Sequence, residues 1–238
     1  MLCKWEALPE SLRTEAVRPY YDSLKKRQGS LVLKRLFDVT VSAVMLLILL
    51  PVFVVLAVAI KLDSPGPVFY RQERVTQFGK HFRIFKFRSM VSNADRIGTQ
   101  VTVGNDNRIT RVGKVIRKCR LDELCQLIDI LRGTMTFVGT RPEVPKYVES
   151  YTSEMMATLL LPAGVTSLAS IFYKDEDRLL EGAEDVDMTY VEKVLPGKMY
   201  YNLKAIQRFN FWDDIRLMFM TVLAVLGVAF KEEEKVKI

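Results

Sequence analysis

The longest uninterrupted apolar stretch lies near the N-terminus. Residues 39–60 contain no charged side chain and exceed the about 20 residues that a helix needs to cross a bilayer. Pro51 lies near the middle, where a proline removes one helix hydrogen bond and bends the helix. Basic residues flank both ends, at 25–35 and 61–83, and the positive-inside rule would keep both flanks in the cytoplasm. Two interpretations stay open here: a helix that breaks at Pro51 and returns to its face of entry, and a transmembrane helix with a proline kink.

A soluble domain is predicted to begin at the breaker cluster Asp-Ser-Pro-Gly-Pro, residues 63–67. Short strands are predicted at 68–70 and 82–88, and the second alternates apolar and basic residues towards its end. In such a strand Lys86 and Arg88 share one face and project together, as two phosphate ligands should. A strand with a solvated basic end is the alternative interpretation.

The segment from Arg117 to Pro142 places the acidic residues Asp122 and Glu123 side by side between arginines. Apolar and polar residues then alternate at helical spacing, and Gly133 suits the helix C-cap. The expected apolar face consists of Leu121, Leu124, Leu127, Ile128 and Leu131, and the opposite face of Asp122, Gln126 and Asp129. Taken alone, this pattern is also typical of a solvated helix whose acidic first turn matches the helix dipole.

The remaining chain carries weaker signals. Residues 1–30 are predicted to form a polar arm with one helix around 9–27, residues 146–161 a helix, and residues 165–173 an extended segment. The acidic run at 175–187 is typical of a solvated helix and loop, with a divalent metal site as the weaker alternative. Residues 217–230 are uncharged but too short to span a bilayer. They are equally compatible with a helix in the membrane interface and a buried core helix.

The composition of the chain limits the classes of molecule that it is expected to bind. The chain has 238 residues, is 49% hydrophobic and carries a net charge of +7, which favours anionic partners such as phosphorylated substrates or a membrane surface. Three cysteines without a C-x-x-C pair, together with one histidine, exclude an ordinary zinc site. No helix-turn-helix, zinc-finger or RNA-recognition pattern is present, so no nucleic-acid partner is expected.

Five stretches together resemble the bacterial sugar transferase family, the monotopic phosphoglycosyl transferases that start surface-glycan assembly on a polyprenyl phosphate. The resemblance runs from about residue 34 to about residue 226, in the family's order. It rests on Lys34-Arg35-Leu36-Phe37-Asp38 before the proline-broken apolar segment, residues 61–72, Phe85-Lys86-Phe87-Arg88-Ser89-Met90, Arg120-Leu121-Asp122-Glu123-Leu124 and residues 137–143.

The resemblance implies an α+β fold, mainly helical, with interfacial helices and a re-entrant membrane helix at 31–62 that breaks at Pro51. A polar arm at 1–30 would precede it. A small cytoplasmic catalytic domain at 63–216 and an apolar helix with a charged tail at 217–238 would follow. The protein would lie on the cytoplasmic face of a bacterial cell membrane, as the short form without a preceding transmembrane bundle.

The resemblance also implies the chemistry. A sugar-1-phosphate would pass from a UDP-sugar to polyprenyl (undecaprenyl) phosphate with release of UMP. Asp122 would be the nucleophile that forms an aspartyl phosphosugar, and Glu123 would hold Mg²⁺ on the diphosphate. The expected substrate-binding residues are Lys86, Arg88, Arg111, Arg141 and Asp187. Membrane lipid and a second copy of the chain are further expected partners.

Four positions depart from the family pattern. Leu50 stands where a serine often precedes the proline, and Asp129 where an asparagine is common. Thr140 replaces a proline and is expected to loosen the loop that holds Arg141. Cys125 also replaces a proline and is expected to alter the helix or to make the protein sensitive to thiol reagents. The transferred sugar is not determined by these motifs; its selection is assigned to the region 166–187. A catalytically silent scaffold is the alternative, and the intact acidic pair argues against it.

Overall fold

The described part of the chain folds into a mainly helical α/β structure with two small sheets, as expected. The computed structural model describes residues 2–92, 94, 106–173, 183, 185–228 and 230. The longer helices are α1 (Arg18–Lys25), α2 (Gln28–Asp63), α3 (Arg111–Lys118), α4 (Gln126–Arg132), α9 (Leu195–Gln207) and α10 (Phe211–Val225). The shorter ones are α5 (Pro145–Val148), α6 (Leu168–Phe172) and α8 (Val186–Thr189). The strands are β1 (Phe69–Val75), β2 (His81–Phe87), β3 (Met135–Val138) and β4 (Ala163–Thr166).

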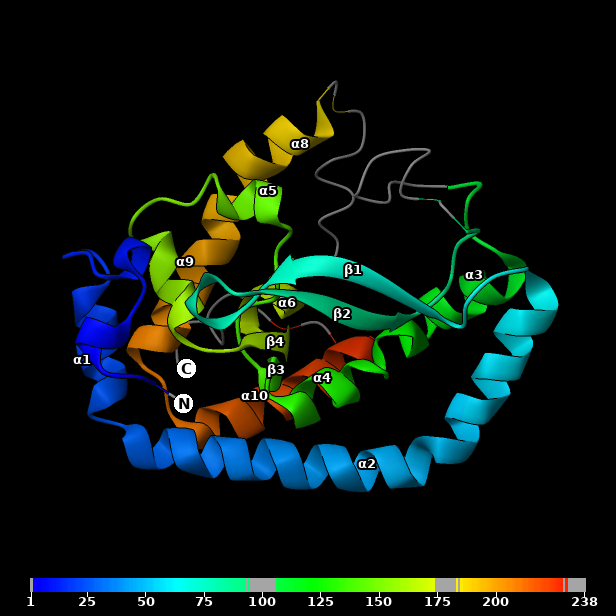
Figure 1. Ribbon diagram of the computed structural model, residues 1–238, viewed down its shortest axis with the longest axis horizontal. Coiled ribbons are helices and arrows are strands. Elements are labelled where there is room, and N and C mark those ends of the chain that lie inside the picture. The colour runs from blue at the N-terminus through cyan, green and yellow to red at the C-terminus, as the bar shows by residue number, and fades with distance from the viewer. Residues whose placement is uncertain are drawn as a thin grey trace.

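Helix α2 is a 36-residue helix that contains Pro51 within it. Figure 1 shows α2 running along the base of the molecule and then changing direction along one end, the kind of bend that a proline causes. Its outer side is apolar and exposed, with Leu47 at 74%, Ile48 at 69% and Val55 at 66%. Among the described residues it is the one helix long and apolar enough to cross a membrane, and this supports membrane association.

A buried polar network ties the first half of α2 to the rest of the chain. The Lys34 ammonium donates to the Asp214 carboxylate at 2.5 Å and to the Val138 carbonyl at 2.7 Å. One turn later, the Asp38 carboxylate accepts a hydrogen bond from the Thr136 hydroxyl at 2.6 Å. Lys34 and Asp38 therefore fix α2 against β3 and α10.

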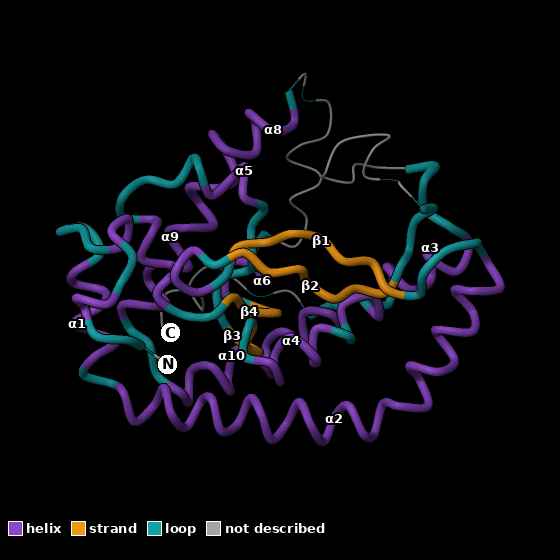
Figure 2. The backbone as a smooth tube through the Cα atoms, in the orientation of Figure 1, coloured by secondary structure: helices purple, strands orange, loops and turns teal. Residues whose placement is uncertain are grey.

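The second half of α2 packs against the same body of the protein. Leu56 and Ile60 are buried beside Phe87 at the end of β2 and Ile116 in α3. Figure 2 shows β1 and β2 as a hairpin, with α4 between this hairpin and α2. Both ends of α2 are thus joined to one domain.

The predicted hairpin strands are confirmed. β1 and β2 pair antiparallel with Tyr70 opposite Lys86, and β3 and β4 form a separate parallel pair. The extended segment expected at 165–173 is confirmed only at Val165 and Thr166 in β4 and is wrong beyond them, because Leu168 begins α6, capped by the Ser167 hydroxyl. The helix expected at 146–161 is also wrong in extent, since a short α5 and a 3-10 helix at Met155–Leu160 share that region.

The N-terminal residues are not the polar arm that the sequence predicted. Leu12, Val17 and Leu24 are completely buried, and they pack with Leu160 and Phe209 in one hydrophobic cluster. The predicted helix at 9–27 is shorter than expected: a 3-10 turn at Glu10–Leu12 precedes α1. Polar residues dominate the composition here, but the large apolar side chains pack into the core.

Helix α10 has one buried face and one exposed apolar face, so residues 217–230 are only in part a core helix. Leu217 and Met220 are buried against Val138, whereas Phe219 is 69% exposed and Leu226 is 75% exposed. One face of the helix therefore belongs to the core, and the other presents apolar side chains at the surface. The predicted charged tail, 231–238, and most of the acidic run at 175–187 lie outside the described residues.

Candidate active site

The acidic pair lies in a 3-10 turn at Leu121–Glu123, and α4 begins only at Gln126. The single amphipathic helix predicted for this segment is therefore wrong at its start. Arg120, directly before the turn, has a left-handed backbone with φ of 55°, a conformation that costs a non-glycine residue free energy and is found mainly at constrained sites. Asp122 and Glu123 therefore sit on a tight turn rather than along a helix.

The polar face expected for α4 is buried instead of solvated. Gln126 and Asp129 are each 2% exposed, whereas Leu131, expected on the apolar face, is 39% exposed. The Asp129 carboxylate accepts a hydrogen bond from the backbone N–H of Phe85 at 2.8 Å, so it satisfies a backbone donor on β2. Gly133 ends α4 with φ of 86°, as predicted for the C-cap.

Glu123 is held by Arg141. The guanidinium donates to both carboxylate oxygens, from Nη2 to Oε1 and from Nη1 to Oε2, the latter at 3.4 Å. Burial alone would raise the pKa of Glu123, but the charges of Arg141 and Lys86 outweigh it and lower this pKa from 4.5 to about 2. Glu123 is therefore ionised at every physiological pH.

Asp122 differs from its neighbour. Among the described residues its carboxylate takes part in no ion pair. Burial and the adjacent charge of Glu123 raise the pKa of Asp122, against the opposing charges of Lys86 and Arg117. Burial also lowers the pKa of Lys86 from 10.5 to about 8, although the charge of Glu123 opposes this. The structure thus brings together Asp122, Glu123, Lys86 and Arg141.

The hairpin contributes a cation that the sequence analysis did not single out. Tyr70 pairs with Lys86 in the hairpin register, so Arg74, four residues further along β1, lies on the same face. Its Nη1 donates to the Pro142 carbonyl at 3.1 Å, next to Arg141. Burial lowers the pKa of Arg74, and its charge also reaches Lys86. Only the strand register, which pairs Tyr70 with Lys86, could have indicated this position.

Arg88 does not project together with Lys86, as the strand pattern had predicted. Its Nη1 donates to the Pro65 carbonyl at 2.6 Å, and its Nη2 to the Ser64 carbonyl at 2.6 Å and the Ile60 carbonyl at 3.2 Å. The Ser64 and Pro65 carbonyls lie just beyond the C-terminus of α2, where carbonyls lack partners within the helix, and the Ile60 carbonyl also accepts from the Ser64 N–H at 3.3 Å. A Cβ atom on Gly66 would lie 2.1 Å from Arg88 Nη1, so the turn after α2 wraps closely around the guanidinium. Its role as a phosphate ligand stays a prediction.

Among the described residues, neither Arg111 nor Asp187 forms a hydrogen bond or ion pair with Asp122 or Glu123. Arg111 begins α3, and its charge acts on Asp63. The Asp187 carboxylate accepts hydrogen bonds from Lys146 at 2.6 Å and from the Tyr147 hydroxyl at 2.5 Å. Their assignment to substrate binding stays a prediction.

The three cysteines lie in different environments. Cys125, the residue expected to confer thiol sensitivity, is completely buried, and burial raises the pKa of its thiol, so it is not a reactive thiol. Cys119, at the end of α3, is exposed, and Cys3 is half-buried. Any thiol chemistry near the acidic pair therefore belongs to Cys119.

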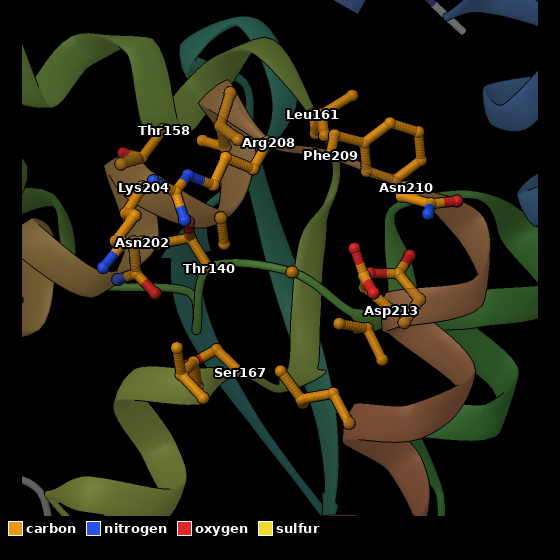
Figure 3. A pocket seen from close by; sticks show the side chains of 17 residues that line it. Thr140, Thr158, Leu161, Ser167, Asn202, Lys204, Arg208, Phe209, Asn210 and Asp213 are labelled. Atoms are coloured by element: carbon orange, nitrogen blue, oxygen red, sulfur yellow. The ribbon is translucent and has the colours of Figure 1, made fainter. Parts of the chain in front are cut away.

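A cavity lies where the loop after β3 meets the end of α9 and the start of α10. Figure 3 shows Thr140, Asn202, Arg208 and Asp213 among the side chains around it. None of the site residues predicted from the sequence lines this cavity. Thr140 faces it, whereas the next residue, Arg141, reaches Glu123.

An exposed apolar helix indicates membrane association, and a half-buried carboxylate pair beside cations suits the binding of phosphate groups. The sequence model of the family described as bacterial sugar transferase matches residues 29–228. The chain belongs to the bacterial sugar transferase family.

Curated relatives agree with this assignment. The chain is 35% identical over 218 residues to the UDP-glucose:undecaprenyl-phosphate glucose-1-phosphate transferase of Escherichia coli (strain K12), covering 90% of this chain and 44% of that protein. It is 34% identical over 197 residues to the UDP-N-acetylgalactosamine-undecaprenyl-phosphate N-acetylgalactosaminephosphotransferase of Aeromonas hydrophila, covering 82% and 44%. The putative undecaprenyl-phosphate N-acetylgalactosaminyl 1-phosphate transferase of Bacillus subtilis (strain 168) is 41% identical over 131 residues, covering 55% and 73%. The chain thus spans less than half the length of the first two relatives.

Proposed function

We propose that this chain transfers a sugar-1-phosphate from a UDP-sugar to polyprenyl phosphate and releases UMP, as the first membrane step of surface-glycan synthesis. The two carboxylates of the acidic pair differ in their ion pairing, and this difference supports the proposal. Glu123 is fixed by Arg141, whereas the Asp122 carboxylate is in no ion pair among the described residues. A carboxylate with available lone pairs beside a fixed cation suits a nucleophile that attacks a charged phosphorus.

The reaction balances in two steps. An Asp122 oxygen attacks the phosphorus that bears the sugar, the bond from this phosphorus to the bridging oxygen breaks, and UMP leaves. A phosphate oxygen of the polyprenyl acceptor then attacks the same phosphorus and expels the Asp122 carboxylate, which is thereby regenerated. Lys86 and Arg141 neutralise the charge on the equatorial oxygens in both steps.

Mg²⁺ fits this donor set. Within the described parts of the chain no cluster of three metal-ligating side chains is present, but Mg²⁺ commonly binds through one or two carboxylates together with substrate phosphates and water. Glu123, with Asp122 beside it, would supply the protein ligand. The ion would add positive charge on the diphosphate of the donor.

We infer that the membrane helix is re-entrant and that the catalytic domain lies on the cytoplasmic side. The first half of α2 is tied to β3 and α10, and its end packs against β2 and α3. A helix that crossed the bilayer would separate these ends by the hydrocarbon core, about 30 Å thick. Attachment of both halves of α2 to one domain supports entry and exit at the same face.

Intact-protein mass spectrometry tests the reaction. The detergent-purified chain is incubated with Mg²⁺ and each of a panel of UDP-sugars, without the polyprenyl acceptor. The expected result is an added mass of one sugar phosphate on the peptide that contains Asp122, and this mass also identifies the sugar. Asp122→Asn is the control and should neither form the adduct nor release UMP. An Asp122→Asn protein with near-normal UMP release would exclude Asp122 as the nucleophile.

A further inference from the structure

A buried charge cluster lies behind Arg141. Glu143 is 6% exposed, and its Oε1 accepts a hydrogen bond from the Tyr190 hydroxyl at 2.6 Å. Lys198, which is 5% exposed, donates to the same Tyr190 hydroxyl at 2.8 Å and lies 3.4 Å from Glu143 Oε1. Lys198 and the charge of Arg74 lower the pKa of Glu143 against the effect of burial. We call Glu143, Tyr190 and Lys198 the buried triad.

Stability alone does not account for the buried triad. Removing two charges from water costs several kcal/mol, and well-packed apolar residues of similar volume are often as stabilising as a buried ion pair. What such a pair provides is a defined geometry, because each member has its partners fixed by hydrogen bonds. The question is therefore which part of the molecule the triad holds in place.

The triad is attached to the loop that carries Arg141. Glu143 is two residues after Arg141, and its own carbonyl accepts a hydrogen bond from Val75 N–H at 3.0 Å. Arg74 holds the intervening Pro142 carbonyl. On the other side of Arg141, the Thr140 carbonyl accepts from Gly164 N–H at 2.8 Å. The backbone is thus fixed on both sides of Arg141, and Glu143 adds an anchor through its own buried side chain.

A π-helical turn brings the triad together. The turn at Tyr190–Val194 is closed by a hydrogen bond from Leu195 N–H to the Tyr190 carbonyl, and it is followed by Pro196, which has no N–H to continue a regular α-helix. In a regular helix, residues eight positions apart would point about 80° away from each other. A π-helical turn contains one extra residue, so Tyr190 and Lys198 are separated by the equivalent of seven α-helical positions. The angle between their directions then falls to about 20°. Tyr190 and Lys198 therefore face Glu143 together only because the turn is π-helical.

The triad also extends to the surface. The rings of Tyr190 and Tyr147 lie 4.6 Å apart, and the Tyr147 hydroxyl donates to Asp187. Asp187 pairs in turn with Lys146. Asp187, which the family resemblance assigns to the site, is thereby connected to the Arg141 loop through two tyrosine rings rather than by direct contact.

We propose that Glu143, Tyr190 and Lys198 are positioning residues that hold the Arg141 loop so that Arg141 stays on Glu123 during phosphoryl transfer. This inference rests on the proposed function. The buried triad should affect the rate of phosphoryl transfer and not the affinity for the UDP-sugar. The reason is that its side-chain hydrogen bonds within the described part of the chain connect its members to one another and not to Asp122 or Glu123. Loss of the triad should leave Arg141 present but imprecisely placed.

The test is Tyr190→Phe, which removes one hydroxyl and keeps the ring that packs against Tyr147. We expect kcat for UMP release to fall about tenfold, with KM for the UDP-sugar changed less than twofold. In an Arg141→Ala background the same substitution should cause no further loss, since residues that act through one another are non-additive. Tyr200→Phe is the matched control: Tyr200 lies on the same helix as Lys198, is 60% exposed, and should change nothing.

Hydrogen exchange provides a measurement independent of activity. In Tyr190→Phe, amide exchange of the peptide that contains residues 139–143 should become at least tenfold faster, and it should not change in Tyr200→Phe. Unchanged exchange in this peptide, or equal fold losses of kcat with and without Arg141, would overturn the positioning role. Faster exchange in a protein that releases no UMP from any donor would support the positioning role and refute the proposed reaction instead.

Discussion

Lys86 offers the sharpest test of the site, because its pKa of about 8 lies within the pH range of an ordinary assay. If the charged form of Lys86 neutralises the donor phosphates, kcat/KM should fall as pH rises through 8. At pH 9 about one tenth of the lysines remain charged, so kcat/KM should be about tenfold below its plateau. The second ionisation of a phosphate monoester lies near pH 6, so the acceptor does not titrate in this window.

Lys86→Arg is the informative variant. Arginine stays charged throughout the assay range, so its normalised profile should be flat from pH 7.5 to 9.5 even if its plateau is lower. Lys86→Met should lower the plateau itself by at least a hundredfold. The measurement is initial-rate UMP release at saturating Mg²⁺ between pH 6.5 and 9.5. A wild-type profile that stays flat to pH 9.5, or a Lys86→Arg profile with the wild-type decline, would refute the assignment of Lys86.

Stability should change in the opposite direction over the same window. The folded-state pKa of Lys86 lies below its unfolded value of 10.5, so the unfolded chain binds more protons between pH 8 and 10.5. The free energy of unfolding contributed by Lys86 is therefore smallest below pH 8 and rises with pH, by up to about 3 kcal/mol. The difference in denaturation midpoint between wild type and Lys86→Met, followed from pH 7 to 10, reports this rise.

Two further predictions concern the membrane helix and the cysteines. In a cysteine-free background, single cysteines at Ser30 and Lys80 should both resist a membrane-impermeant thiol reagent in intact cells and both react after lysis; labelling at only one of them before lysis would mean a helix that spans the bilayer. In the purified native chain, a small maleimide should modify Cys119 within minutes and Cys125 only after denaturation, as peptide mapping would show, with Cys119→Ser as the control. Rapid modification of Cys125 in the folded protein would contradict its burial.

The relatives differ in the sugar that their names specify, glucose for one and N-acetylgalactosamine for another. Both match this chain at nearly the same identity. Overall similarity therefore does not select a donor, and the sugar panel in the mass-spectrometry experiment is needed to identify it.

Local features of the chain were predictable from the sequence. The apolar stretch of α2, the strands of the hairpin and the C-cap at Gly133 depend on composition, period and backbone preference within a few residues. The adjacency of Asp122 and Glu123 is a covalent fact and needs no fold. The family resemblance rested on such short motifs, and the comparisons confirmed it.

The partner of each charged side chain was decided only by the tertiary structure. Lys86 and Arg88 have similar local sequence, yet one reaches the acidic pair and the other binds the carbonyls that end α2. Asp129 was placed on the polar face of the predicted helix, yet it is buried, and its carboxylate accepts from a backbone N–H of β2. A long side chain can pair with any group that the fold brings within a few ångströms, and that group lies 44 residues away in sequence for Asp129 and 18 for Glu123. The sequence thus determines which chemical groups the protein has, and the packing of distant segments determines which of them meet.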